Sequence, residues 1–228
     1  MAKTEPSNQT ARLPRRERER LQRRNSIIDA AEKRFFESGF DGVSMDDIAH
    51  DLELSKPALY RYFKNKESLF YAVVLRGMVI LRDTIKQAVN KEKTGRNKIL
   101  GFIQSFCFDY VRKNADYYRL LNVAREQRFL DMFQRHEIER AHEFGQMALE
   151  MLTYLVDAIK LGIKDGTIRQ SLDPLQTAIF LVVTAEATIN LTPVYEDLVT
   201  QKNIKKDEYL QHSIDLMLHG ISLEKPKK

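Results

Sequence analysis

The chain has 228 residues, 43% of them hydrophobic, and its 37 lysines and arginines outnumber 32 aspartates and glutamates to give a net charge of +5. This length and composition allow one large domain, or a small domain joined to a larger one, with a sizeable core. The single cysteine, Cys107, excludes an internal disulfide and fits a reducing compartment. The sequence contains neither an apolar run long enough to span a bilayer nor a signal peptide, so we expect a cytoplasmic protein that does not bind a membrane.

Residues 1–22 are predicted to form a basic, disordered N-terminal arm. The positive charge of this region comes from Arg12, Arg15, Arg16, Arg18, Arg20, Arg23 and Arg24. Such a segment is either a solvated lead-in to the next helix or an arm that lies on DNA phosphates or enters the minor groove. We favour the second interpretation because of the helix pair that follows the arm.

The residues after the arm are predicted to form three helices joined by short turns. From Asn25 onward apolar residues recur at helical spacing, and two glycines end this first helix. Ser44 then opens a second helix with Asp47 as its capping-box partner, and Ser55 opens a third. Asn65 is the predicted cap of the helix after that.

Two lysines stand where helices usually begin with an acidic residue. A helix start carries partial positive charge, yet Lys56 and Lys66 each directly follow a cap. An anion from outside the protein would resolve the misfit, and a helix start flanked by lysine is a phosphate site. The helix opened by a serine at position 55 also exposes Tyr60, Arg61 and Tyr62 beside two apolar positions. This pattern favours a helix that lies in the major groove of DNA.

The signature in this segment consists of Ser44, Ile48, Ala49, Ser55, Leu59, Tyr60, Tyr62, Phe63, Lys66, Glu67 and Leu69. In these residues and their spacing, the chain resembles the helix-turn-helix of the TetR family of bacterial and archaeal transcription regulators. The resemblance is specific over residues 24–75, and beyond them only the order of helices agrees. Two positions depart from the family pattern: Glu53 replaces the turn glycine, and Pro57 replaces a glycine early in the recognition helix.

The predicted DNA-binding domain covers residues 23–70. Its predicted contacts to double-stranded DNA are Arg24, Ser44, Met45, Ser55, Lys56, Pro57, Ala58, Tyr60, Arg61, Tyr62, Lys64 and Lys66. One recognition helix makes few contacts, so we expect a homodimer on a palindromic operator with half-sites ~34 Å apart.

The rest of the chain is also predicted to be helical. Residues 69–89 continue from the DNA-binding domain as a connecting rod, and further helices are expected over residues 99–111, 117–123, 175–191 and 206–218, with one long helix or two in line over residues 129–163. No strand-like alternation appears in the sequence. The predicted fold class is therefore all-α, with an N-terminal three-helix helix-turn-helix domain, a larger C-terminal helical domain over residues 71–224 and a tail over residues 225–228.

The resemblance implies that the C-terminal domain binds a small effector and forms the homodimer. The last two long helices carry small residues on apolar faces, where two copies can pack closely. The candidate ligand-binding residues are Phe102, Phe106, Tyr110, Tyr118, Phe133, His136, Met147, Met151, Tyr154, Phe180, Thr184 and Asn190. This aromatic and methionine pattern is also typical of a plain core. The predicted effector is largely apolar: a lipid, an acyl thioester or an aromatic compound.

Motifs for catalysis are incomplete. His136 and Glu137 begin a zinc-protease helix motif, but Arg140 occupies the position of the second histidine. Cys107 lies in an apolar helix without a partner thiol. The sequence thus predicts no catalytic residue, metal or cofactor, and favours a ligand-responsive repressor over two alternatives: a ligand-independent DNA-binding protein and an all-helical enzyme.

Overall fold

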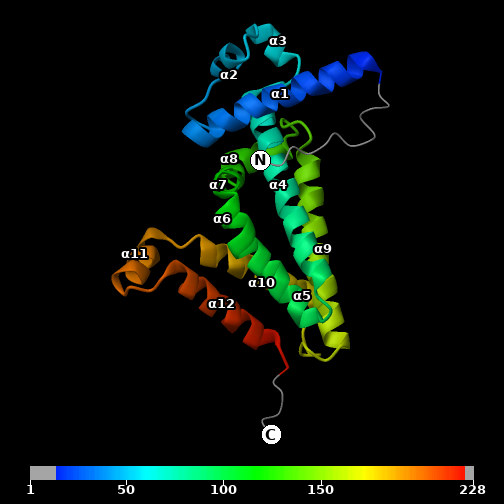
Figure 1. The fold of residues 1–228 in the computed structure, drawn as a ribbon, viewed down its shortest axis with the longest axis vertical. Helices are drawn as coiled ribbons and strands as arrows, with labels where there is room; N and C mark the ends of the chain where they lie inside the picture. The colour runs from blue at the N-terminus through cyan, green and yellow to red at the C-terminus, as the bar shows by residue number, and fades with distance from the viewer. Residues whose placement is uncertain (1–13, 224–228) are drawn as a thin grey trace. The chain divides into compact units, whose positions relative to one another are not determined.

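The computed structural model describes residues 14–223, and these residues form helices joined by short connections (Figure 1). In chain order the helices are α1 (Arg15–Ser38), α2 (Met45–Asp51), α3 (Lys56–Tyr60), α4 (Lys66–Lys91), α5 (Gly95–Gln104), α6 (Val111–Lys113), α7 (Ala115–Ala124), α8 (Gln127–Gln134), α9 (Ala141–Lys164), α10 (Pro174–Ile189), α11 (Pro193–Gln201) and α12 (Lys206–Ile221), with a π-helical turn, η2 (Ser105–Tyr110), after α5. Residues 14–223 form no strand beyond one isolated bridge between Ile168 and Ser222. The predicted all-α class is confirmed.

Helix α1 begins at Arg15, so the prediction that residues 15–22 are disordered is wrong. The stretch is rich in arginine, glutamate and glutamine, which are good helix formers, and it contains no glycine or proline after Pro14. Arg15 and Glu19 also form an i,i+4 ion pair at 2.7 Å on the helix surface. The remainder of the predicted arm, residues 1–13, and the predicted tail over residues 225–228 lie outside the described residues.

The chain divides into two compact units. The first contains the chain up to Arg76 together with Arg119–Ala141, and the second contains Gly77–Tyr118 and the chain from His142 onward. Helix α4 therefore contributes to both units. The helix-turn-helix unit is larger than the predicted segment 23–70, because it includes α8 and most of α7, which the sequence had placed in the C-terminal domain.

A cluster of four phenylalanines holds the first unit together. The ring of Phe70 on α4 lies 5.4 Å from Phe35, 4.9 Å from Phe40 and 5.2 Å from Phe129, measured between ring centroids. All four rings are buried. Buried aromatic rings supply a large share of the stabilisation of a small domain. Because Phe129 belongs to α8, this packing explains why residues 119–141 join the helix-turn-helix.

Polar contacts add to this attachment. The guanidinium of Arg128 on α8 donates to both carboxylate oxygens of Asp41, at 2.8 and 3.0 Å, and this hydrogen-bonded pairing lowers the pKa of Asp41. The buried hydroxyl of Tyr71 donates to the backbone carbonyl of Ala124 at 2.9 Å. The segment is thus anchored at two separate points of the first unit.

The turn between α2 and α3 contains a left-handed residue. Glu53 has φ of 52°, its N–H donates to the carbonyl of His50, and the N–H of Leu54 donates to the carbonyl of Ala49. This is the position at which the family pattern has glycine, which adopts such angles without steric cost. The turn therefore forms despite the missing glycine, with a side chain in a conformation that residues other than glycine rarely adopt.

Helices α5 and α9 of the second unit meet backbone to backbone. A Cβ atom at Gly95 would lie 2.0 Å from the backbone nitrogen of Gly162. Of the two alternatives predicted for residues 129–163, one long helix or two, the structure has two, α8 and α9, and His136 and Arg140 adopt positive φ between them.

Helix α11 was not predicted from the sequence, and none of its residues is buried in the chain.

No single helix among the described residues has the length and hydropathy to cross a membrane. Helices α10 and α11, which bend by 66° at the residues between them, meet that criterion only when taken together.

Replacing Glu53 with glycine should stabilise the first unit. Relief of the left-handed conformation, about 1–2 kcal/mol, exceeds the extra chain entropy of glycine, about 0.5–1 kcal/mol, so Glu53→Gly should raise the free energy of unfolding by up to about 1 kcal/mol in a urea titration. Glu53→Ala is the control, because it removes the carboxylate and keeps the Cβ atom. A glycine variant no more stable than the alanine variant would contradict the strain at this turn.

Candidate nucleic-acid interface

Helix α3 is positioned by burial of one side. It has only five residues, and isolated helices shorter than ~12–15 residues are marginal in water. Leu59 on α3 and Phe63 just after it are 0% and 1% exposed. Because these two side chains are fixed in the core of the first unit, the opposite side of α3 is held toward solvent.

The solvent side of α3 carries cations and a phenol. Of the predicted contacts to DNA, the exposed ones here are Ser55, Lys56, Pro57, Tyr60, Arg61 and Lys64, and Ala58 and Tyr62 are half-buried. Lysine and arginine suit phosphate oxygens, while arginine and a tyrosine hydroxyl can also reach base edges. The predicted division of α3 into a buried and an exposed side is confirmed.

Lys56 is engaged in an exposed ion pair. Its Nζ lies 3.0 Å from Oδ2 of Asp46, and the two side chains are 57% and 63% exposed. Hydrogen bonding to Asp46 raises the pKa of Lys56. Exposed pairs of this kind contribute little to stability, so a phosphate can replace the carboxylate.

Helix α2 begins with the predicted capping box. The hydroxyl of Ser44 accepts from the N–H of Asp47 at 3.1 Å, and the Asp47 carboxylate accepts from the N–H of Ser44 at 2.8 Å. The Ser44 hydroxyl, which donates to this carboxylate at 2.6 Å, and then the Ser44 N–H lower the pKa of Asp47. Met45, the first helical residue, is 6% exposed. The DNA contact predicted for the Met45 side chain is therefore not supported, because that side chain is part of the core.

Lys66 does not present a free cation. Its Nζ donates to the carbonyls of Phe40 and Val43 at 3.0 and 2.9 Å and lies 4.1 Å from the centroid of the Phe40 ring. A lysine has three donors, and two of them are used here. Lys66 thus stabilises the loop after α1, and this explains a cation at the start of α4 without an external phosphate.

An ion pair fixes α1 against α2. The guanidinium of Arg34 donates to both carboxylate oxygens of Asp51 at 2.6 Å. This bidentate pairing lowers the pKa of Asp51. The pair is one of the contacts that hold α2 against α1.

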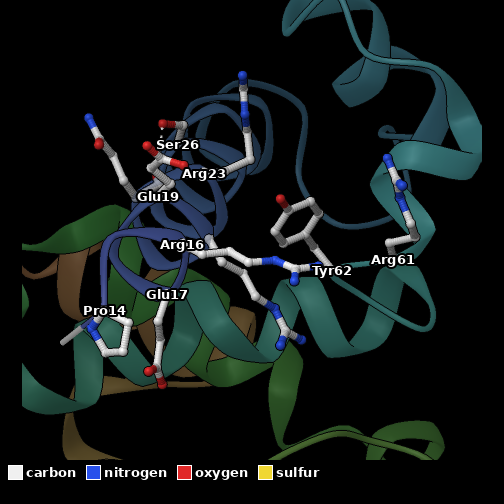
Figure 2. A pocket seen from close by; sticks show the side chains of 10 residues that line it. Pro14, Arg16, Glu17, Glu19, Arg23, Ser26, Arg61 and Tyr62 are labelled. Atoms are coloured by element: carbon white, nitrogen blue, oxygen red, sulfur yellow. Dashed lines mark hydrogen bonds between the residues drawn. The ribbon is translucent and has the colours of Figure 1, made fainter.

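A basic groove runs along α1 and reaches the residues that follow α3 (Figure 2). Its volume is about 1320 Å³, and it is lined by Pro14, Arg16, Glu17, Glu19, Arg20, Gln22, Arg23, Ser26, Arg61 and Tyr62. Arg24, another predicted contact, instead covers the Phe63 ring at 4.6 Å and is half-buried. The groove was not predicted because this arginine-rich stretch was expected to be disordered. The spacing of Arg16, Arg20 and Arg23 could have indicated one face of a helix.

The candidate ligand-binding residues do not fall in one unit. Phe133 and His136 belong to the first unit, and the other ten belong to the second. Phe102, Phe106, Tyr110, Tyr118, Met147 and Met151 are buried there, Thr184 and Tyr154 are half-buried, and Asn190 and Phe180 are exposed.

Two groups of these candidates are brought together. Tyr118 lies edge-on to Phe106, with centroids 6.1 Å apart, and its hydroxyl accepts from the amide of Asn190 at 2.7 Å. Phe180 and Thr184 line a second groove, between α10 and α12.

Burial raises the pKa of the Cys107 thiol to about 12, so a thiolate nucleophile is not favoured at this position.

Comparison with known proteins finds a family match within the first unit. Residues 27–73 match the model for bacterial regulatory proteins of the tetR family. The chain is 33% identical over 110 residues to the transcriptional activator FasR of Mycolicibacterium smegmatis, covering 48% of each chain. It is 32% identical over 107 residues to IcaR of Staphylococcus aureus, a negative regulator of a biofilm operon, covering 45% of this chain and 56% of IcaR. The chain thus matches about half the length of these relatives.

The fold is also that of solved regulators. The transcriptional regulator FadR of Bacillus subtilis, solved with stearoyl-CoA, aligns over 86% of this chain and 97% of its own with a TM-score of 0.62 and 19% identity. The family match covers the second half of α1, all of α2 and α3 and the start of α4, so it includes the exposed side of α3. Residues 27–73 of this chain are thus similar to the helix-turn-helix of the tetR family of bacterial regulatory proteins.

Proposed function

We propose that this protein is a cytoplasmic transcriptional regulator that binds a palindromic operator as a homodimer and responds to a small, largely apolar effector. The observation that carries the proposal is the two-sided α3. Leu59 on α3 and Phe63 just after it are buried, whereas Lys56, Tyr60 and the following Arg61 face solvent, within a segment that matches the tetR family. This arrangement serves binding of duplex DNA and offers no catalytic group.

An apolar face on α10 and α12 supports the homodimer. Leu175, Ile179 and Val183 recur every four residues on α10 and are 47–59% exposed, Phe180 is 54% exposed, and Leu216 on α12 is 60% exposed. A contiguous exposed apolar patch of this kind marks an interaction surface. A second copy related by a twofold axis would cover the same patch on both chains and bring two α3 helices to one operator.

The effector is proposed from the aromatic interior of the second unit. Phe102, Phe106 and Tyr110 are buried on α5 and η2, and Tyr118 and Asn190 supply a polar pair beside Phe106. Apolar walls with a few polar groups are typical of a small-molecule site. The solved FadR carries stearoyl-CoA, so an acyl thioester is the first ligand to test. A ligand-independent DNA-binding protein is the alternative.

The direction of regulation is proposed to be repression. The relatives support either direction, since FasR is a transcriptional activator and IcaR a negative regulator. A reporter gene fused to the DNA upstream of this protein's own gene distinguishes the two, because deletion of a repressor raises expression and deletion of an activator lowers it.

Removing two exposed side chains of α3 should weaken specific binding to DNA. The variant Lys56→Ala with Tyr60→Ala leaves the buried side of α3 intact, so folding is retained, while operator affinity should fall at least about tenfold, since a good base contact is worth about 1–3 kcal/mol. Fluorescence anisotropy with a duplex selected from a random pool measures this, with Lys86→Ala, an exposed lysine of the second unit, as control. If the double variant binds the selected duplex as tightly as the Lys86→Ala control does, α3 is not the recognition helix.

A charge on the apolar face of α10 should separate the dimer. Phe180→Glu places a carboxylate where the second copy is proposed to pack, so sedimentation should show a monomer with weakened operator binding. Leu149→Glu on α9 is the matched control, because Leu149 is 64% exposed and lies outside this face. A Phe180→Glu protein that remains dimeric would locate the interface elsewhere.

Acyl-CoA should lower operator affinity if the second unit is a sensor. A ligand shifts the protein between two states only through its different affinity for them, and a tenfold loss of DNA affinity corresponds to about 1.4 kcal/mol of coupling. Anisotropy titrations with a long-chain acyl-CoA, a short-chain acyl-CoA and free CoA separate the acyl group from the nucleotide. A ligand that saturates the protein without changing its DNA affinity would favour the ligand-independent alternative.

A further inference from the structure

Three arginines form a ladder on one face of α1. Arg16, Arg20 and Arg23 are spaced by four and three residues, which places them one above the other on a helix. All three are exposed and all three line the groove in Figure 2, together with Arg61 and Tyr62 from the residues that follow α3. The ladder therefore shares a surface with the residues at the C-terminal end of α3, the proposed recognition helix.

The positive charge of this ladder is not compensated by neighbouring acids. Among residues 14–223, none of the three arginines lies within ion-pair distance of a carboxylate. Glu19, which also lines the groove, is paired with Arg15 at 2.7 Å. The groove is thus lined by four arginines, Arg61 included, against two glutamates, one of which is already engaged.

We propose, on the basis of the function proposed above, that the ladder on α1 is a second DNA-binding element that holds the phosphate backbone. Two modes of DNA binding were considered for this region: contact with the phosphate backbone and insertion into the minor groove. The observation that the region is helical decides between them. A helix with side chains is ~10–12 Å wide, whereas the minor groove is about 6 Å wide. Residues 15–24 in a helix therefore cannot enter the minor groove as an extended arm would, but they can lie along the sugar-phosphate backbone.

The dimensions of the ladder suit a single DNA strand. From Arg16 to Arg23 the helix rises about 10 Å, and along the duplex axis one strand presents a phosphate about every 3.4 Å, so about three phosphates lie alongside. Arginine binds phosphate through paired N–H donors, and it carries its charge at any physiological pH. The tyrosine and arginine after α3 continue this surface toward the bases read by α3.

The test is the salt dependence of DNA binding by the full chain. Arg16→Ala, Arg20→Ala and Arg23→Ala together preserve helix propensity and should reduce the slope of log K against log salt by up to about three per protomer. Affinity should fall equally for the selected operator and a scrambled duplex, because phosphate contacts carry no sequence information. Lys33→Ala, an exposed cation on the same helix that does not line the groove, is the matched control and should leave the slope unchanged.

The outcomes separate this inference from the proposed function. If the parent protein binds the operator and the triple alanine variant keeps the same slope, the ladder does not bind phosphate and only this inference fails. If the parent binds no duplex at all, the proposed function fails first. The triple lysine variant should restore most of the slope; a variant that restores charge but not the slope, or one that alters base preference, would also overturn the assignment to phosphate.

Discussion

Burial of Leu59 and Phe63 is the constraint on which the basic face of α3 depends. Five residues cannot maintain a helix alone in water, so the exposed cations and phenol keep their geometry only because these two side chains are fixed in the core. The phenylalanine cluster of α1, α4 and α8 is buried in the same unit. A hydrophobic defect in the cluster would therefore weaken DNA binding without touching a residue that meets DNA.

Because residues 119–141 belong to the same unit as the helix-turn-helix, the chain connects the proposed sensor to that unit through α7 as well as through α4. The connecting helix α4 belongs to both units, as the sequence suggested, but α7 also crosses from one unit to the other. Arg128 and Phe129 join α8 to Asp41 and Phe40 close to the start of α2. An effector that shifts α7 would therefore act on the loop before α2 as well as on α4.

The helix-turn-helix could be predicted from the sequence because its signals are local. Caps such as Ser44 and the alternation of Leu59 with exposed cations are set within a few residues, and the structure bears them out. The role of Lys66 could not be predicted, since its partners are backbone carbonyls of Phe40 and Val43, more than twenty residues away. The ladder on α1 was missed because arginine-rich composition was taken as disorder, although the same residues favour a helix. The ligand-binding candidates depend on packing between distant helices, which periodicity alone does not determine.

Photocross-linking from position 60 tests most directly whether α3 reads DNA. A photoreactive phenylalanine analogue that replaces Tyr60 keeps an aromatic side chain at an exposed position. In complex with the selected duplex, it should cross-link to bases within each half-site, and the same analogue at exposed position 149 on α9 should not. Cross-links from position 149 but none from position 60, in a protein that binds the duplex, would contradict the account of α3 as the recognition helix.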